Sequence, residues 1–214
     1  MSIVTSTATE SALTADDILK RFRDSGALLR GHFKLTSGRH SDVYYEKFAI
    51  LKDPQVCEPV CRTLAGMFAA SGAKYVVGPT TGGVIIAYSV ANANGLTALY
   101  AEPAGPADSP TTGRVFKRGF SLEKGDRVLI VDDVLTTGRS LDEVIALVRS
   151  YGAEIVGIGV FLDRSGGAMA KGRPQDGVPP VRALASVSAE SWEPDACPLC
   201  AKGEPITQRG SRKG

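Results

Sequence analysis

The chain has 214 residues, of which 43% are hydrophobic and 22% charged, and this composition excludes collagen-like, largely disordered and disulfide-scaffold proteins. A chain of this length can fold as one domain without metal ions or disulfide bonds. Its 25 basic residues barely outnumber its 23 acidic ones, and the last thirteen residues alone carry +3, which leaves residues 1–201 at −1. Without a general basic field, the sequence argues against nucleic-acid binding.

No stretch reaches the length of a membrane span, and the first residues form neither a basic leader nor an apolar signal segment. We therefore expect a cytoplasmic protein with no membrane partner. Its four cysteines are then expected to be reduced thiols. Cys57 and Cys61 lie one turn apart on a predicted amphipathic helix, as small core residues often do. Cys197 and Cys200 are the better metal candidates, but no second pair with suitable loop geometry is evident, so zinc is not favoured.

The expected elements begin after a leader over residues 1–13, which is rich in Ser, Thr and Ala and has no periodicity. Thr14, followed by two aspartates, predicts a helix that ends near Gly26. From Leu28 to Ile50 the side chains are typical of strands on either side of an SGRHSD turn. These features predict a small N-terminal hood, with a hairpin, over about residues 14–52.

The middle of the chain alternates helical periodicity with short apolar runs. Helices are expected from Val56 to the Gly72 stop and over 84–93 and 141–149, and strands over 75–77, 97–100, 128–131 and 155–162. This alternation predicts an α/β fold, with a parallel twisted sheet flanked by helices. We expect a single domain over 14–201, followed by a basic C-terminal tail over 202–214.

A long loop rich in Pro, Gly, Ser and Thr lies between Glu102 and Gly113. Loops of this length inside a compact domain often cover a functional site. The basic residues Arg114, Lys117 and Arg118 follow it. They would offer cations to an anionic ligand, or else form a solvated charge cluster.

The strongest chemical signal is VLIVDDVLTTGRS, residues 128–140. An apolar strand leads to Asp132 and Asp133, and a Thr-Thr-Gly turn then enters a helix. Ligands bind at the carboxyl ends of such strands, and the turn with the helix start can hold a phosphate. The carboxylates suit ribose hydroxyls, Mg²⁺ or positive charge developing on a sugar carbon. Each element alone also has a structural explanation, such as a solvated strand end or a Ser140–Glu143 capping box, but together they indicate a phosphorylated sugar.

The same segment resembles the phosphoribosyl pyrophosphate motif of the type I phosphoribosyltransferase family. Residues 31–51, GHFKLTSGRHSDVYYEKFAIL, resemble the N-terminal segment of orotate phosphoribosyltransferases, and the likeness continues in VVGPTTGG (76–83), AEP (101–103), RVFKRGF (114–120), FLDRSGG (161–167) and CPLC. The resemblance covers about residues 14–210 and implies the type I phosphoribosyltransferase fold. It implies Mg²⁺-dependent transfer of the 5-phosphoribosyl group from phosphoribosyl pyrophosphate to N1 of orotate, giving orotidine 5′-monophosphate and pyrophosphate in pyrimidine synthesis.

The resemblance also implies roles for individual residues. The catalytic residues would be Asp132, Asp133 and Lys117, with Mg²⁺ held mainly by substrate phosphates and ribose near the two aspartates. The phosphoribosyl pyrophosphate site would comprise Asp132, Asp133, Val134, Leu135, Thr136, Thr137, Gly138, Arg139, Ser140, Arg114, Lys117 and Arg118. The orotate site would comprise Thr136, Arg164, Tyr44 and Tyr45. A guanidinium can donate two parallel hydrogen bonds to a carboxylate, although Arg164 could instead be a surface partner of Asp163.

The family further implies a homodimer in which the loop over about 103–118 reaches the neighbouring active site. Thr36 and Gly82 stand where many members carry lysine, and Lys34 is the nearest cation before Thr36. Pyrophosphate contacts would then pass to backbone amides of the Thr80–Gly83 turn.

Two other functions compete with this interpretation. A purine-base phosphoribosyltransferase has no reason to carry the SGRHSD hood or Arg164. A regulator that senses phosphoribosyl pyrophosphate needs a DNA-binding module, and residues 1–27 are too short to hold one.

Overall fold

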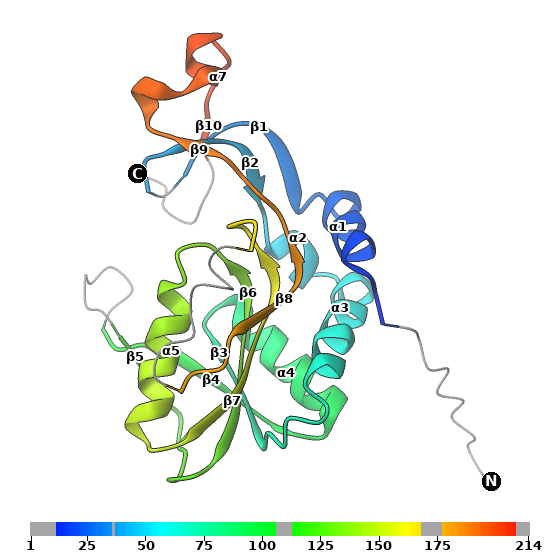
Figure 1. Ribbon diagram of the computed structural model, residues 1–214, viewed down its shortest axis with the longest axis vertical. Coiled ribbons are helices and arrows are strands. Elements are labelled where there is room, and N and C mark those ends of the chain that lie inside the picture. The colour runs from blue at the N-terminus through cyan, green and yellow to red at the C-terminus, as the bar shows by residue number, and fades with distance from the viewer. Residues whose placement is uncertain (1–11, 36, 106–112, 168–176, 209–214) are drawn as a thin grey trace, which may run out of the picture.

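The computed structural model describes residues 12–35, 37–105, 113–167 and 177–208, and it arranges them around two sheets (Figure 1). The helices are α1 (Ala15–Asp24), α2 (Phe48–Leu51), α3 (Pro54–Met67), α4 (Gly82–Asn94), α5 (Arg139–Ser150) and α7 (Pro198–Ala201), with a 3₁₀ turn at Pro194–Ala196. The strands are β1 (Leu28–Lys34), β2 (His40–Tyr45), β3 (Tyr75–Pro79), β4 (Thr97–Pro103), β5 (Arg114–Val115), β6 (Arg127–Leu135), β7 (Glu154–Asp163), β8 (Val181–Ser186), β9 (Ser191–Trp192) and β10 (Thr207–Gln208).

The larger sheet has the order β5-β4-β3-β6-β7-β8, and all its pairs are parallel except β4 with the edge strand β5. Its strands are covered on both faces. Leu129 and Val131 of β6 pack with α3 and α4, whereas Val128 and Ile130 pack with α5, as alternating side chains must. The expected α/β fold with a parallel, doubly covered sheet is confirmed.

Local signals place the first helix where the sequence predicts it. The hydroxyl of Thr14 accepts the backbone N–H of Asp17 at 3.2 Å, and the Asp17 carboxylate accepts the N–H of Thr14 at 3.0 Å. This reciprocal capping box begins α1, which ends just before Gly26 at a φ of +73°. By contrast, α3 ends at Met67, before the expected stop at Gly72.

Strand β6 is longer than expected, because its ladder with β7 continues past the apolar run. Asp132 pairs with Val160 and Leu135 with Asp163, so both aspartates belong to the strand rather than following it. Even so, they lie in its carboxyl-terminal half, close to the edge where α5 begins. Both aspartates therefore lie near the carboxyl end of the strand, where the sequence predicts ligand binding.

The smaller, four-stranded sheet forms the hood, with the order β10-β1-β2-β9. The expected hairpin of β1 and β2 is present, but both outer strands come from the other end of the chain. β10 pairs parallel with β1, and β9 pairs antiparallel with β2. Figure 1 shows the blue hairpin and the orange C-terminal segment together above the larger sheet.

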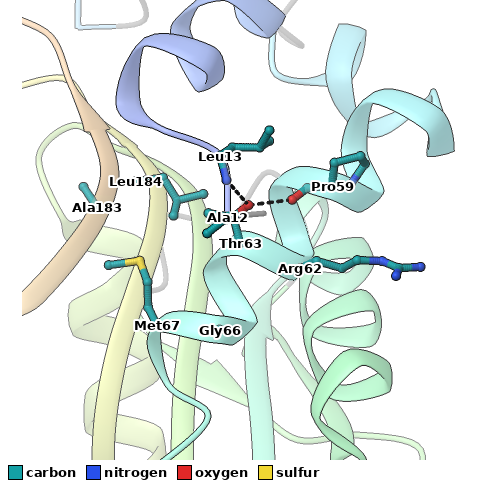
Figure 2. A pocket seen from close by; sticks show the side chains of 9 residues that line it. All are labelled: Ala12, Leu13, Pro59, Arg62, Thr63, Gly66, Met67, Ala183 and Leu184. Atoms are coloured by element: carbon teal, nitrogen blue, oxygen red, sulfur yellow. Dashed lines mark hydrogen bonds between the residues drawn. The ribbon is translucent and has the colours of Figure 1, made fainter. Parts of the chain in front are cut away.

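A hollow of about 530 Å³ lies between α3, β8 and the residues before α1, away from the strand ends (Figure 2). The Thr63 hydroxyl links two segments that line this hollow: it accepts a hydrogen bond from the N–H of Leu13 at 3.2 Å and donates one to the carbonyl of Pro59 at 2.8 Å. Arg62 is its one ionisable lining residue, and in Figure 2 this side chain points away. The ionisable groups that could carry chemistry lie at the strand ends instead. Among the described residues, no helix is long and apolar enough to cross a membrane.

Candidate active site

The turn after β6 leads directly into α5. Gly138 is the N-cap residue of α5 and adopts the left-handed conformation at φ +78°, which favours glycine. No side chain caps this helix, so the proposed Ser140–Glu143 capping box is wrong; Glu143 instead lies 2.9 Å from Arg139. The start of α5 therefore keeps the backbone N–H groups that can hold a phosphate.

Two buried carboxylates lie beside this turn. Asp132 and Asp133 are 8% and 5% exposed. The backbone N–H of Asp133 donates to Asp132 Oδ1 at 2.8 Å, and that of Val134 donates to Asp133 Oδ1 at 2.7 Å. Burial, together with the neighbouring Asp133 charge, raises the pKa of Asp132 to about 7. The pair therefore favours a further cation.

Lys47 supplies one such cation, and sequence reasoning missed it. Its ammonium lies 2.9 Å from Asp133 Oδ2. Burial alone would lower the pKa of Lys47, but the charges of Asp133 and Asp132 raise it above its usual value. Its position could have pointed to it, because Lys47 lies in the family-like segment 31–51, between the two tyrosines and the start of α2.

The close approach of Asp133 leaves no room for a side chain at Gly82, at the start of α4. A Cβ atom on Gly82 would lie 2.1 Å from Asp133 Oδ2, so any side chain here would displace that carboxylate. Helix α4 can approach the acidic pair only because position 82 is glycine. The cation beside the pair comes instead from Lys47, the N-cap residue of α2.

Arg164 directly follows β7 and faces the hood. Its guanidinium carbon lies 5.5 Å from the Tyr45 ring centroid, and its Nη2 donates to Ser41 Oγ at 3.3 Å. Asp163 is fully buried and accepts two hydrogen bonds from Ser165, at 2.8 and 2.6 Å. Arg164 is therefore not the surface partner of an exposed Asp163.

These groups meet in one cavity of about 310 Å³. It is lined by Tyr44, Tyr45, Lys47, Pro79, Thr80, Gly82, Asp132, Asp133, Val134, Thr136, Ser140 and Arg164. A second cavity, of about 510 Å³, is also lined by Tyr44, Thr136 and Arg164, together with hood residues that include Arg39 and Ser191. All four residues proposed for orotate thus line one cavity with the acidic pair.

The predicted phosphate-site residues 132–140 also stay together. Asp132, Val134, Leu135, Thr136, Thr137, Gly138, Arg139 and Ser140 line a small hollow at the start of α5. Asp133 faces the larger cavity described above.

The three basic residues after the long loop have different surroundings. Arg114 donates to the carbonyl of Ala101 at 2.9 Å and to Thr80 Oγ1 at 3.3 Å, and its side chain is only 10% exposed. Arg118 forms an ion pair with Glu102 at 3.0 Å, while Lys117 is exposed. Most of the loop before Arg114, residues 106–112, lies outside the described residues, and so does Thr36.

The raised pKa of Asp132 predicts how stability depends on pH. Between the ordinary value of 3.8 and about 7, the native carboxyl keeps a proton that the unfolded chain has lost, so its contribution to stability falls as pH rises. Asp132→Asn removes this titration. The parent protein should lose stability as pH rises through this range, and the variant should not. The unfolding free energy of the variant minus that of the parent should therefore rise by about 2–4 kcal/mol. Urea unfolding of both proteins from about pH 5 to 8 tests this, and a difference that does not change with pH contradicts it.

Comparison with known proteins places the chain in a family. Residues 61–186 match the phosphoribosyl transferase domain. The chain is 43% identical to orotate phosphoribosyltransferase from Pelotomaculum thermopropionicum, over 94% of this chain and 100% of the relative, and 40% identical to that from Desulforamulus reducens, over 94% and 99%. The crystal structure of orotate phosphoribosyltransferase from Aeropyrum pernix, 30% identical, superposes with a TM-score of 0.63 over 79% of this chain and 93% of that one. The chain belongs to the orotate phosphoribosyltransferase family.

Proposed function

We propose that the cavity between the acidic pair and Arg164 is the active site for the family reaction. The protein transfers the 5-phosphoribosyl group from phosphoribosyl pyrophosphate to N1 of orotate, which yields orotidine 5′-monophosphate and pyrophosphate. One observation carries the assignment of the site: a single cavity of about 310 Å³ joins groups suited to a phosphate, a sugar and an acidic base. The cytoplasmic location stays a prediction, which cell fractionation would check.

The turn and helix start after β6 would bind the 5′-phosphate. Thr136, Thr137 and Ser140 offer hydroxyls there, and the first turn of α5 offers backbone N–H groups with a positive partial charge. Asp132 and Asp133 would then accept hydrogen bonds from the ribose hydroxyls. Because the two sets belong to consecutive elements, they fix the sugar relative to its phosphate.

Arg164 and the two tyrosines would bind orotate. The guanidinium can donate in parallel to the orotate carboxylate, and Ser41 and Tyr45 hold it at the hood wall of the cavity. Tyr44 and Tyr45 provide aromatic surface for a flat pyrimidine ring. Uracil lacks the carboxylate, so this arrangement favours orotate over it.

The acidic pair would lower the barrier by stabilising positive charge. As the bond from C1 to pyrophosphate breaks and the bond from orotate N1 to C1 forms, the sugar passes through an oxocarbenium-like state, and the N1 proton leaves to the departing pyrophosphate or to solvent. Carboxylates fixed by the backbone N–H groups of Asp133 and Val134 need little reorganisation to stabilise that charge. Lys47 holds Asp133 in place through their ion pair at 2.9 Å.

The same residues fit Mg²⁺. Two adjacent carboxylates, one with a raised pKa, form an oxygen-rich site that gains from a divalent cation. Asp132 and Asp133 would hold the ion together with the substrate hydroxyls. When bound, it would neutralise charge on the leaving pyrophosphate.

A spectrophotometric assay tests the function directly. Purified protein with Mg²⁺ and phosphoribosyl pyrophosphate should consume orotate, followed by loss of its absorbance, and leave uracil, hypoxanthine and adenine unchanged. Turnover of a purine would support the competing transferase. Binding of phosphoribosyl pyrophosphate without turnover of any base would favour the sensor.

The homodimer and the role of the loop over about 103–118 are further parts of this proposal. If Lys117 acts in the neighbouring active site, Lys117→Ala and Asp133→Asn should each be nearly inactive alone. Mixed dimers would then contain one active site with both native residues. Denaturing the two variants together and refolding them should restore about one quarter of the parent activity, because half the dimers are mixed and each has one intact site. No recovery, with dimers present by sedimentation, would place Lys117 in its own subunit's site.

A further inference from the structure

Four side chains outside the active site meet at the far end of the hood. His32 lies on β1 and His40 on β2, whereas Cys197 is the N-cap residue of the short helix α7 and Cys200 lies within that helix. Their ligand atoms all lie within 4.8 Å of one another. In Figure 1, α7 lies at the end of the molecule farthest from the larger sheet. The second pair of ligands that the sequence did not reveal is therefore a pair of histidines.

The distances match the edges of one coordination tetrahedron. Zinc bound to two nitrogens and two sulfurs has nitrogen–nitrogen edges of about 3.3 Å and nitrogen–sulfur edges of about 3.6 Å. His32 Nε2 lies 3.0 Å from His40 Nδ1, 3.5 Å from Cys197 Sγ and 3.7 Å from Cys200 Sγ. Cys200 Sγ lies 3.3 Å from His40 Nδ1.

The environment of His32 prepares its ring for a metal. The other ring nitrogen, Nδ1, lies 2.8 Å from the backbone carbonyl oxygen of Glu204, which can only accept a hydrogen bond. Nδ1 therefore carries the proton, and in the neutral ring the lone pair is on Nε2. Three groups converge on that one lone pair. A hydrogen bond from His40 would satisfy it but leave both thiols without a comparable role, whereas a cation at the centre binds all four.

The C-terminal segment also lacks a hydrophobic reason to fold here. From residue 193 to 208, Cys197 is the one buried residue, at 3% exposed, and Leu199 is half-buried. Yet the segment forms a 3₁₀ turn, a short helix and a strand paired to β1. Segments with so little apolar burial usually depend on a disulfide or a metal.

We propose that His32, His40, Cys197 and Cys200 bind one Zn²⁺ ion, which fastens residues 193–208 to the hood. Two thiolates and two neutral imidazoles balance the charge of the ion and fill its four positions. The site is therefore closed and structural. It would also steady one wall of the second cavity, because Ser41 follows His40 and donates to the carbonyl of Glu190, and Arg39 Nε donates to Ser191 Oγ.

The first test is the metal content of the full-length protein, produced without a histidine tag and purified without chelators. Elemental mass spectrometry should find about one zinc per chain. Cys200→Ser changes a ligand in a segment with almost no core contacts, so the main fold should persist while zinc falls at least tenfold. Cys57→Ala is the control: Cys57 Sγ lies 3.7 Å from Cys61 Sγ inside α3, away from the four proposed ligands, so this variant should keep its zinc.

Cobalt provides a second readout that does not depend on the variant folding. After zinc is exchanged for Co²⁺, the parent protein should show the intense visible bands of a tetrahedral ion and thiolate-to-cobalt charge transfer. The proposal is overturned if the parent protein, produced in zinc-supplemented medium, contains less than about a tenth of an equivalent of zinc and takes up no Co²⁺. A Cys197–Cys200 disulfide in the purified protein, or zinc lost from Cys57→Ala alone, would overturn it too.

Discussion

Replacing Asp133 with asparagine is expected to lower kcat by about 10²–10³-fold, the effect typical of removing one preorganised electrostatic group from an active site. The amide keeps the oxygen that accepts the N–H of Val134, so the local backbone is preserved. What is lost is a negative charge beside the developing cation. The partner ammonium of Lys47 is more than a third exposed, so leaving it unpaired costs little stability.

Steady-state kinetics and thermal unfolding together test this prediction. We expect the melting temperature to move by only a few degrees. Asp24→Asn is a suitable control, because it removes an exposed carboxylate on α1 that pairs with Lys20. A variant at position 133 that keeps its kcat but melts far lower would remove this residue from the reaction and leave it a structural role.

Replacing Arg164 with alanine should lower kcat/KM for orotate by about 10²–10³-fold, because a charged, two-bond contact with the substrate carboxylate is lost. The phosphate turn is on a different element, so KM for phosphoribosyl pyrophosphate should change far less. Arg164→Lys should recover part of the loss, since an ammonium restores the charge but not the parallel hydrogen bonds. This pattern separates binding of the base from general damage.

Arg182→Ala is the matched control for Arg164. Arg182 is on the neighbouring strand β8, where it contacts the Phe68 ring at 5.2 Å and donates to the Met67 carbonyl at 2.6 Å. Its loss should leave kcat/KM for orotate within about twofold, as expected for a surface side chain. Equal losses in both variants, or an equal rise in both substrate KM values for Arg164→Ala, would contradict a specific role in orotate binding.

The sequence predicts the larger sheet well because its signals are local. Apolar runs such as residues 128–131 and 155–162 fall inside β6 and β7, and the Thr14 capping box begins α1. The missed strands β5, β8, β9 and β10 have two to six residues, and β9 and β10 acquire their partners from the opposite end of the chain. Periodicity over so few residues cannot identify a strand whose hydrogen bonds come from so far away.

The same distinction applies to the site. A strand, an acidic pair and a glycine turn follow one another in sequence, so residues 132–140 are recognisable as a unit. Lys47 was missed because its role comes from a contact with Asp133, 86 residues later. For Arg114 the charge alone suggested a pyrophosphate contact. In the structure the side chain already contacts the Ala101 carbonyl, the Thr80 hydroxyl and, at 3.3 Å, the Glu143 carboxylate, and its role toward substrate stays a prediction.

The joining of β1 to β10 has a consequence for synthesis of the protein. Phe33 pairs with Thr207, 174 residues later, so the smaller sheet cannot gain its edge strand beside β1 until β10 has been synthesised. The larger sheet closes over much shorter separations and can form first. A nascent chain would therefore carry a folded larger sheet and an incomplete hood until β10 is synthesised. Chains that stop before β10 would keep that core but lack the edge strand of the smaller sheet.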